Sequence, residues 1–479
     1  MLALGSKPVL STTLLLLVAG CTTPDRSREV VPAYLEPEVV ELPTTDAPAA
    51  SPSPLVQTAS EPMHTDVALV AHQLPADSLE ELEQLAAVQN PRLTRLYHEY
   101  QASLAKSRYV DKLPDPRFGA NVFGNPIQTA SGSQRANMTF SQAVPWLSRL
   151  RADEQRAIFE AYAIHAEMEA ERLRVQAAVR TNWYRLYLLD KQIEIAQANQ
   201  RLLNSLIDVA NARISTGAAS QGDVLLGTLE LSQLEERLLG YRRQRKGVES
   251  ELNRLVARDS DASIQSATLL PPGMPELDPQ QLTALAVEYQ PELEAARMRT
   301  HATRWGVEVS RLMRRPEFVF SASYYPTDNN RPPSTVVDVG QDPWALGAQV
   351  SIPIWHNKYD AIEDEAKWKH QAAHNTVEEL TDRYESIVLD LVAEVRRAHE
   401  TAMLYNSTIL PQARQTLAAD QDSYTNGSVE FDRVIRDYRN LLTLEVGYHQ
   451  AIGDMATAIA KLRQAAGADF PLTPAVPLP

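Results

Sequence analysis

Two stretches of the chain alternate apolar and polar residues with the period of a β-strand. They span 117–144 and 317–354, and glycine, asparagine and proline interrupt both. Their apolar residues keep one parity, as at every second position of 318–324. We expect two strands in each stretch, joined by polar loops at 125–133 and 326–342.

Long stretches with helical periodicity follow these strands. No proline or glycine stands between Trp146 and Thr216, and only Pro411 interrupts the stretch from Trp355 to Asn426. Seventy helical residues would extend about 105 Å. Apolar residues in these regions alternate at spacings of three and four, which is typical of a coiled-coil seam. Amphipathic helices in a globular bundle share this spacing but not this length.

One such seam lies in the segment after Gly217, with a single interruption at Arg245. Gly217 and Gly427 stand where the long helices must turn, which predicts helical hairpins with turns near 216–222 and 426–430. The seam residues are Leu231, Leu234, Leu238, Tyr241, Val248, Leu252 and Leu255.

The chain repeats itself between about residues 77 and 470. Asn90-Pro91 recurs as Gln290-Pro291, and Gly217 has its counterpart 210 positions later in Gly427. An ordered series of such matches indicates an internal duplication. We therefore expect two structural repeats, 77–270 and 271–470, and a tail at 471–479.

The first 76 residues have the composition of a targeting segment and a linker. An apolar run within 1–20 is too short to span a bilayer but suits a signal peptide. Small residues precede Cys21, as in a bacterial lipobox, so we expect lipidation of this cysteine. A lone thiol near an ordinary cleavage site is the alternative. Prolines throughout 21–76 predict an extended tether.

Composition excludes several classes of protein. The 479 residues carry a net charge of −15 and the pI is near 5.2, which argues against nucleic acid as a partner. A mean hydropathy of −0.30 excludes a polytopic helical membrane protein. One cysteine excludes a disulfide framework. No nucleotide, nucleophile or metalloprotease motif is present, so we expect no enzyme activity and no cofactor.

Four short strands beside long helices raise the question of how the strand edges are paired. In a membrane the edges cannot stay unpaired, because lipid offers no hydrogen bonds. Four strands cannot close a pore, so copies of the chain would have to pool their strands. A soluble α+β fold remains open if the strands line a globular core.

The sequence resembles the TolC family of outer-membrane efflux channels over about residues 77–470. The resemblance lies in the duplicated helix–strand–strand–helix order, the lipobox, and the segments that begin at Gly217 and Gly427. The segments Leu113-Pro114-Asp115-Pro116 and Ser141-Gln142-Ala143-Val144-Pro145 are similar to the heavy-metal-efflux branch of the CzcC or CusC kind.

This resemblance implies a duplicated α+β membrane fold and a homotrimer. Each chain would give four strands to a shared 12-stranded β-barrel and its helices to a coiled-coil α-helical barrel in the periplasm. The implied function is the outer-membrane exit duct of a tripartite efflux pump, anchored in outer-membrane lipid, with a periplasmic adaptor (membrane fusion) protein and an inner-membrane RND transporter as partners. The cargo would be small substrates, with heavy-metal cations as a candidate class. A type I protein-secretion channel and a coiled-coil spacer lipoprotein are the alternatives.

The resemblance also implies a periplasmic gate at the hairpin turns. Asp223 matches a lumen-facing carboxylate six residues after the turn glycine, and Tyr424 matches a tyrosine that helps hold the tip closed. The second repeat departs from the pattern, because Arg433 occupies the corresponding position. With Asp432 and Arg436 it would supply ion pairs between protomers.

Simpler roles compete with the gate. Ser220 and Asp223 also fit an N-terminal capping box, and plain helix packing would account for Tyr424 and Arg436. His370 and His374, four apart on a predicted helix, form a weak candidate metal site that chance also explains.

Overall fold

The computed structural model describes residues 78–129, 132–265, 273–276, 278–328 and 340–473. The chain divides into two compact units, Met1–Pro62 and Met63–Pro479, and every described residue belongs to the second. The expected signal peptide, Cys21 and the proline-rich segment therefore lie outside the described residues.

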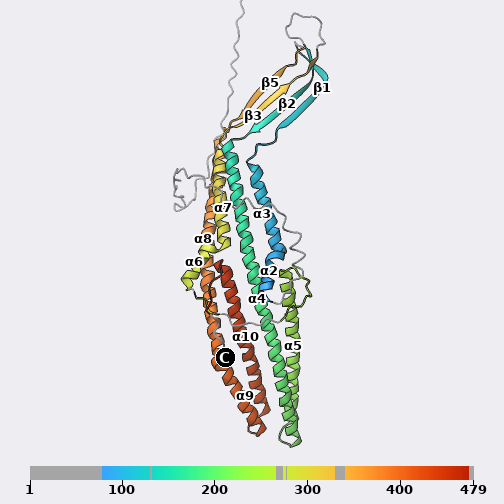
Figure 1. Cartoon of the computed structure of the whole chain (residues 1–479), viewed down its shortest axis with the longest axis vertical. Helices are drawn as coiled ribbons and strands as arrows, with labels where there is room; N and C mark the ends of the chain where they lie inside the picture. Colours follow the sequence, from blue (N-terminus) through green and yellow to red (C-terminus); the bar gives the residue numbers. More distant parts are fainter. Residues whose placement is uncertain (1–77, 130–131, 266–272, 277, 329–339, 474–479) are drawn as a thin grey trace, which may run out of the picture. The chain divides into compact units, whose positions relative to one another are not determined.

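The same order of elements occurs twice along the chain (Figure 1). Each repeat has a short helix, a second helix that begins at a proline, a strand pair and a pair of long helices. The first repeat contains α2 (Leu79–Gln89), α3 (Pro91–Val110), β1 (Arg117–Thr129), β2 (Gly132–Val144), α4 (Leu147–Ser215) and α5 (Gln221–Leu255). The second contains α6 (Pro279–Tyr289), α7 (Pro291–Leu312), β3 (Glu317–Tyr324), β4 (Thr327–Asp328), β5 (Trp344–Ser351), α8 (His356–Leu404), the π-helical turn η2 (Tyr405–Ile409), α9 (Leu410–Thr425) and α10 (Phe431–Ala466).

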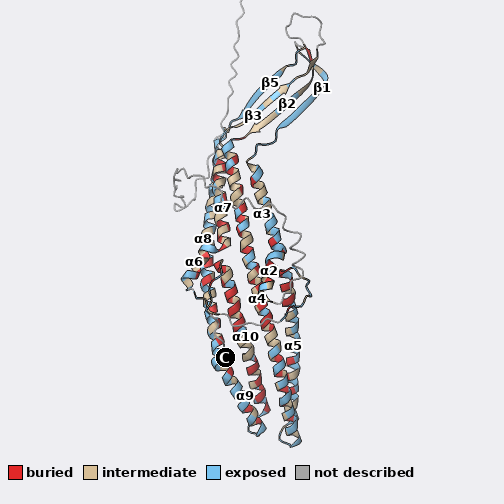
Figure 2. Ribbon diagram, in the orientation of Figure 1, coloured by how far each residue is buried: buried red, intermediate tan, exposed pale blue. Residues whose placement is uncertain are grey.

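Helix α4 is the element around which both repeats pack. It contacts α3 and α5 of its own repeat, and α7 and α10 of the other. Its 69 residues correspond to about 100 Å of helix. Near the strands its buried residues are mostly alanine, which allows α7 to approach closely, whereas Trp183, Leu186 and Tyr187 form a larger core farther along. Figure 2 shows these buried positions as a red stripe along the helices.

Proline accounts for the break in the second long helical region. Pro411 lies in the first turn of α9, and it cannot donate a hydrogen bond to the preceding turn. The backbone responds with a π-helical turn at Tyr405–Ile409. Gly447 of α10 lies against this turn, since a Cβ there would come within 2.8 Å of the Tyr405 hydroxyl oxygen.

The strands form one antiparallel sheet in the order β1-β2-β3-β5, and β4 adds two residues beside β2. The predicted loop at 125–133 is wrong, because β1 continues to Thr129 and β2 begins at Gly132. Pro126 is tolerated there since β1 is an edge strand and its register shifts between Val122 and Ile127. The second predicted loop contains β4, and residues 329–339 lie outside the described ranges.

The two faces of this sheet differ in chemistry. Residues paired across antiparallel strands project to the same side, so the register assigns each side chain to a face. One face carries polar and small residues such as Asn121, Asn137, Thr139, Ser321 and Gln349. The other is almost wholly apolar, with Gln142, which pairs with Phe320, as a polar exception. Its apolar residues are Phe118, Ala120, Val122, Ala136, Met138, Phe140, Val144, Phe318, Phe320, Ala322, Tyr324, Trp344, Leu346, Ala348 and Val350.

The repeated Asn-Pro and Gln-Pro motifs have a shared structural role. Each places a buried side-chain amide before a helix, and that amide donates to carbonyls at the end of the last helix of its own repeat. The Asn90 amide donates to the Leu255 carbonyl at 2.9 Å. The Gln290 amide donates to the carbonyls of Gln464 and Ala465 at 2.9 and 3.0 Å. The motif thus satisfies helix ends that would otherwise leave carbonyls unpaired.

Candidate functional site

The two helical hairpins turn at matching glycines. Gly217 and Gly427 have φ values of +71° and +81°, the left-handed conformation that glycine adopts without strain. After α4, the amides of Gly217 and Ala218 donate to the carbonyls of Ile214 and Arg213, each at 2.9 Å. Equivalent bonds close the end of α9. The turns predicted at these glycines are therefore present.

Side chains from all four helix ends meet beside these turns. Tyr424 of α9 is only 2% exposed, and its ring packs on Phe431 of α10 with centroids 5.2 Å apart. Its hydroxyl donates to a carboxylate oxygen of Asp223 of α5 at 3.4 Å. The Arg213 guanidinium of α4 lies 4.3 Å from the centroid of the same ring. We call Arg213, Asp223, Tyr424 and Phe431 the hairpin cluster.

Arg213 joins the two hairpins through backbone carbonyls. Its Nη1 donates to the Tyr424 carbonyl at the end of α9, and its Nη2 donates to the Ala218 carbonyl at 3.0 Å. Helices α4 and α9 both end here, and helix C-termini carry partial negative charge. One guanidinium therefore lies between two carbonyl-rich ends that would otherwise repel each other.

Arg213 was not among the residues expected at the gate, although it lies only four residues before Gly217. Its position in the last turn of a helix, where a cation can satisfy free carbonyls, was the available signal. Beside Arg213, burial raises the pKa of Tyr424, and the nearby Asp223 carboxylate raises it further. The phenol therefore stays protonated and can donate a hydrogen bond.

Asp223 occupies the third position of α5, as a capping box requires. However, Ser220 makes no side-chain bond to the helix backbone. Its hydroxyl instead donates to the Asp223 carboxylate at 2.8 Å. The carboxylate is thus shared between Ser220 and Tyr424, and its orientation toward a pore stays a prediction.

The other predicted gate residues pair within the chain. Arg436 lies 2.9 Å from Asp432 on the same helix, and both side chains are more than half exposed. Arg433 lies 2.6 Å from Asp420 of α9. Burial, and then a hydrogen bond with Asp420, raises the pKa of neighbouring Asp437. Their proposed pairing between protomers stays a prediction.

The two histidines of the candidate metal site contact different neighbours. His370 Nδ1 lies 3.2 Å from the Thr303 hydroxyl, and His374 Nδ1 lies 3.6 Å from Glu378. Burial lowers the pKa of His370. Across the described ranges, no group of three or more histidine, cysteine, aspartate or glutamate side chains is placed to hold a metal ion.

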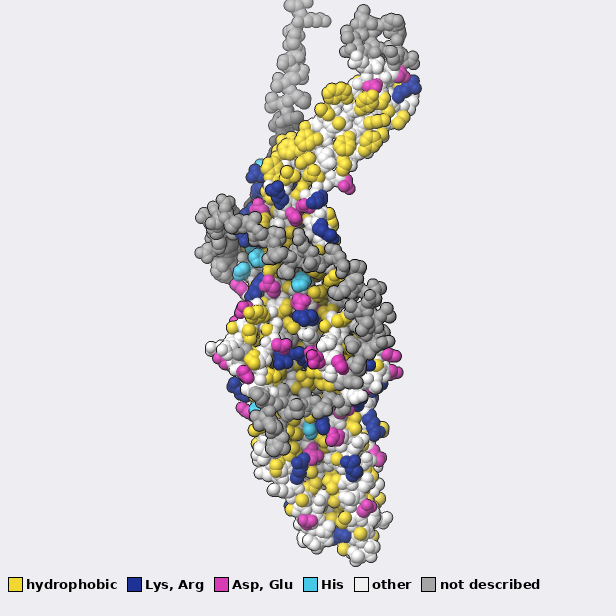
Figure 3. Space-filling view, in the orientation of Figure 1, with side chains coloured by type: hydrophobic (Ala, Val, Ile, Leu, Met, Phe, Trp, Pro, Cys, Tyr) yellow, Lys and Arg dark blue, Asp and Glu magenta, His cyan; other side chains and the backbone are white. Residues whose placement is uncertain are grey.

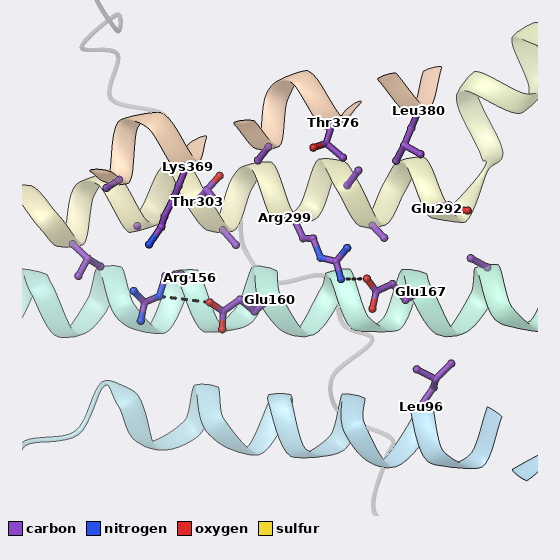
Figure 4. A pocket seen from close by; sticks show the side chains of 18 of the residues that line it. Leu96, Arg156, Glu160, Glu167, Glu292, Arg299, Thr303, Lys369, Thr376 and Leu380 are labelled. Carbon is purple, nitrogen blue, oxygen red and sulfur yellow. Dashed lines mark ion pairs between the residues drawn. The ribbon is translucent and has the colours of Figure 1, made fainter. Parts of the chain in front are cut away.

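A cavity of about 980 Å³ lies among α3, α4, α7 and α8 (Figure 4). Its lining includes several alanines together with side chains of both signs of charge. Each charged lining residue takes part in an ion pair, for example Arg156 with Glu160 and Arg299 with Glu167. The lining of this cavity carries six cationic and five anionic side chains, so its charge is close to balanced although the whole chain is acidic.

The surface over the sheet is unusual for water-exposed protein. Figure 3 shows hydrophobic side chains gathered over the strands, whereas charged side chains are frequent over the helices. Leu346 is 77% exposed and Trp344 71%. Trp355, directly after the sheet, is 70% exposed. A contiguous apolar surface of this kind marks contact with lipid or with other protein. Among the described residues, no helix has both the length and the apolar character needed to cross a bilayer.

Comparison with known proteins agrees with this architecture. No protein-family model matches the chain. The pyoverdine export outer membrane protein OpmQ of Pseudomonas putida is 22% identical over 317 residues, covering 60% of this chain and 62% of that protein. The match thus spans less than two thirds of the curated relative.

Solved structures match over more of the chain. The outer membrane protein VceC from Vibrio cholerae has a TM-score of 0.69 and 19% identity, covering 82% of this chain and 97% of that one. CusC has a TM-score of 0.70 and 15% identity, covering 82% and 92%. The outer-membrane channel OprN has a TM-score of 0.70 and 16% identity, covering 82% and 90%. The chain therefore has the fold of the TolC family of outer-membrane channels, as its sequence motifs imply.

Proposed function

We propose that this protein is the outer-membrane exit duct of a tripartite efflux system. The observation that carries the proposal is the two-faced sheet joined to long helices. Its apolar face suits lipid, and its polar face suits a water-filled lumen. The sheet leaves β1 and β5 as open edges. Lipid does not satisfy open edges, so three copies would pair them and pool twelve strands into one barrel.

In this proposal the hairpin turns form the gate. They lie at the opposite end of α4 from the strands, so they would face the periplasm when the sheet is in the outer membrane. The hairpin cluster holds four helix ends together by stacking and hydrogen bonds. Separation of these ends would widen the passage, and their contact would narrow it. The duct itself would catalyse no reaction.

The partners follow from the duct's position. It would receive cargo from a periplasmic adaptor and an inner-membrane, proton-driven transporter of the RND class. Lipidation of Cys21 would add an anchor at the outer membrane. The motifs at 113–116 and 141–145 support heavy-metal cations as one class of small cargo, and the resemblance to a pyoverdine export protein supports pyoverdine as another.

The test is to purify the full chain in detergent and add it to planar bilayers. We expect a trimer that forms ion-conducting pores, and mass spectrometry should find lipid on Cys21. A monomeric, non-conducting protein would favour a spacer lipoprotein. A deletion strain that becomes sensitive to metals, dyes or antibiotics supports efflux, whereas loss of a secreted protein alone supports type I secretion.

Asp223 offers a specific test of the gate. Replacing Asp223 with alanine removes the acceptor of the Tyr424 hydroxyl and one negative charge per chain. We expect higher conductance through the closed tip or weaker cation preference. The matched control is Asp208→Ala, which removes an exposed carboxylate on α4. Equal behaviour of the two variants would contradict a special role for Asp223.

A further inference from the structure

Glu230 is a fully buried carboxylate at the place where the two hairpins meet. It lies on α5 with an exposed fraction of 0%. One carboxylate oxygen accepts a hydrogen bond from Arg439 Nε of α10 at 2.7 Å. This ion pair crosses from the first repeat to the second beside α4, so it holds α5 and α10 in a fixed relation.

Close backbone packing brings the carboxylate to this position. Gly227 lies one turn before Glu230, and a Cβ there would meet the Ile207 side chain of α4 at 2.7 Å. The adjacent Tyr438 of α10 is also fully buried, and its hydroxyl donates to the Asn199 carbonyl of α4 at 3.4 Å. The surroundings are therefore tightly packed, and a charge left here without a partner would be strongly unfavourable.

The second carboxylate oxygen of Glu230 lies near another arginine, Arg237. This Oε1 is buried and accepts no hydrogen bond from any described residue. The Nη2 of Arg237 lies 4.0 Å from it, at the outer limit of an ion pair. Arg237 is on α5 itself, two turns after Glu230, and in the described part of the chain it has no other ion-pair partner.

The two arginines thus differ in one respect that matters for movement. Arg439 belongs to the neighbouring hairpin and would leave with α10, whereas Arg237 stays with Glu230 wherever α5 moves. A buried carboxylate that loses its only partner resists the separation strongly. A second partner on the same helix removes that obstacle, because the carboxylate stays paired in both arrangements.

We propose that Glu230 is a two-position latch between the hairpins. It binds Arg439 when α5 and α10 are together, and it transfers to Arg237 when they separate. The latch rests on the proposed gating of the duct, because it describes how the hairpins part. It predicts that the two arginines have opposite effects on opening, although both contact the same carboxylate.

The first experiment needs no pore. Thermal unfolding of the full chain in detergent is compared for Arg237→Gln, Arg439→Gln and the double variant. Each single variant leaves Glu230 one partner, and the double variant leaves none. The latch therefore predicts a melting-temperature loss in the double variant that clearly exceeds the sum of the single losses. Adding Glu230→Gln to the double variant should recover much of this excess. A simple sum would overturn the latch.

The second experiment measures opening in planar bilayers. Arg439→Gln should raise the open probability at least about tenfold, because Arg237 then holds the carboxylate without α10. Arg237→Gln should lower it below that of the unmodified chain. Shifts in the same direction, or no shift in either variant, would overturn the latch. An unmodified chain that forms no pores would instead refute the proposed function, and the unfolding comparison would then judge the latch alone.

Discussion

The strongest test of the hairpin cluster is the replacement of Arg213 by glutamine. The variant loses two hydrogen bonds to backbone carbonyls and the stacking of a guanidinium over the Tyr424 ring. A hydrogen bond from a charged donor contributes about 1.5–3 kcal/mol, and an exposed cation–π contact about 0.5–1 kcal/mol. Arg213 is half-exposed, so solvent screening reduces these values. We expect a combined loss of about 2–4 kcal/mol in the contact between hairpins.

A loss of about 2 kcal/mol shifts an equilibrium between closed and open hairpins roughly 30-fold. The assay is the open probability of single channels in planar bilayers without partner proteins. Arg213→Lys is expected to be intermediate, because it keeps a charge near both helix ends but loses the planar fork.

Arg397→Gln is the matched control. It breaks an exposed ion pair between Arg397 and Glu394 on α8 that contributes only about 0.2–1 kcal/mol. The control should therefore open like the unmodified chain. If Arg213→Gln opens no more often than Arg397→Gln, Arg213 does not hold the hairpins together.

Three further predictions concern stability and the sheet. Gln290→Leu orphans two carbonyls at the end of α10 and should lower unfolding stability by about 1–3 kcal/mol, measured as a fall in melting temperature. His449 contacts the Tyr187 hydroxyl at 3.0 Å, and burial lowers the pKa of this histidine to about 4. The folded chain therefore binds fewer protons than the unfolded chain between about pH 6.5 and pH 4. Stability should fall as pH falls through this window, and His449→Leu should flatten the melting-temperature profile there. Leu346→Lys on the apolar face should impair membrane insertion, whereas Gln349→Lys on the polar face should insert normally and change ion selectivity; equal insertion would contradict the assignment of faces.

The long helices and the sheet were predictable because their patterns are periodic and nearly free of proline. Alternation along 317–324 and 344–351 is regular enough to assign both strand and face. The extent of β1 was not predictable, because Asn125-Pro126 is an ordinary turn signal. Its strand conformation depends on an edge position that only the tertiary structure shows.

The candidate site was predictable in part, for a similar reason. The turn glycines have a local signature, since a left-handed residue must end each helix. The role of Arg213 depends on a carbonyl 211 residues away in sequence, and that of Glu230 on an arginine 209 residues away. No local pattern encodes such distant contacts. The repeated Asn-Pro and Gln-Pro motifs showed where the repeats correspond, but their amide bonds to distant helix ends appear only in the structure.

These amide bonds also bear on the order in which the chain folds. Asn90 reaches a carbonyl 165 residues later, at the end of the same repeat. The first repeat can therefore close its own ends before the second repeat exists, and synthesis from the N-terminus provides that interval. Early closure would leave β2 without its partner strand β3, and the apolar face of β1 and β2 would be exposed. We therefore expect nascent chains that stop between the repeats to aggregate through their strands rather than through their helices.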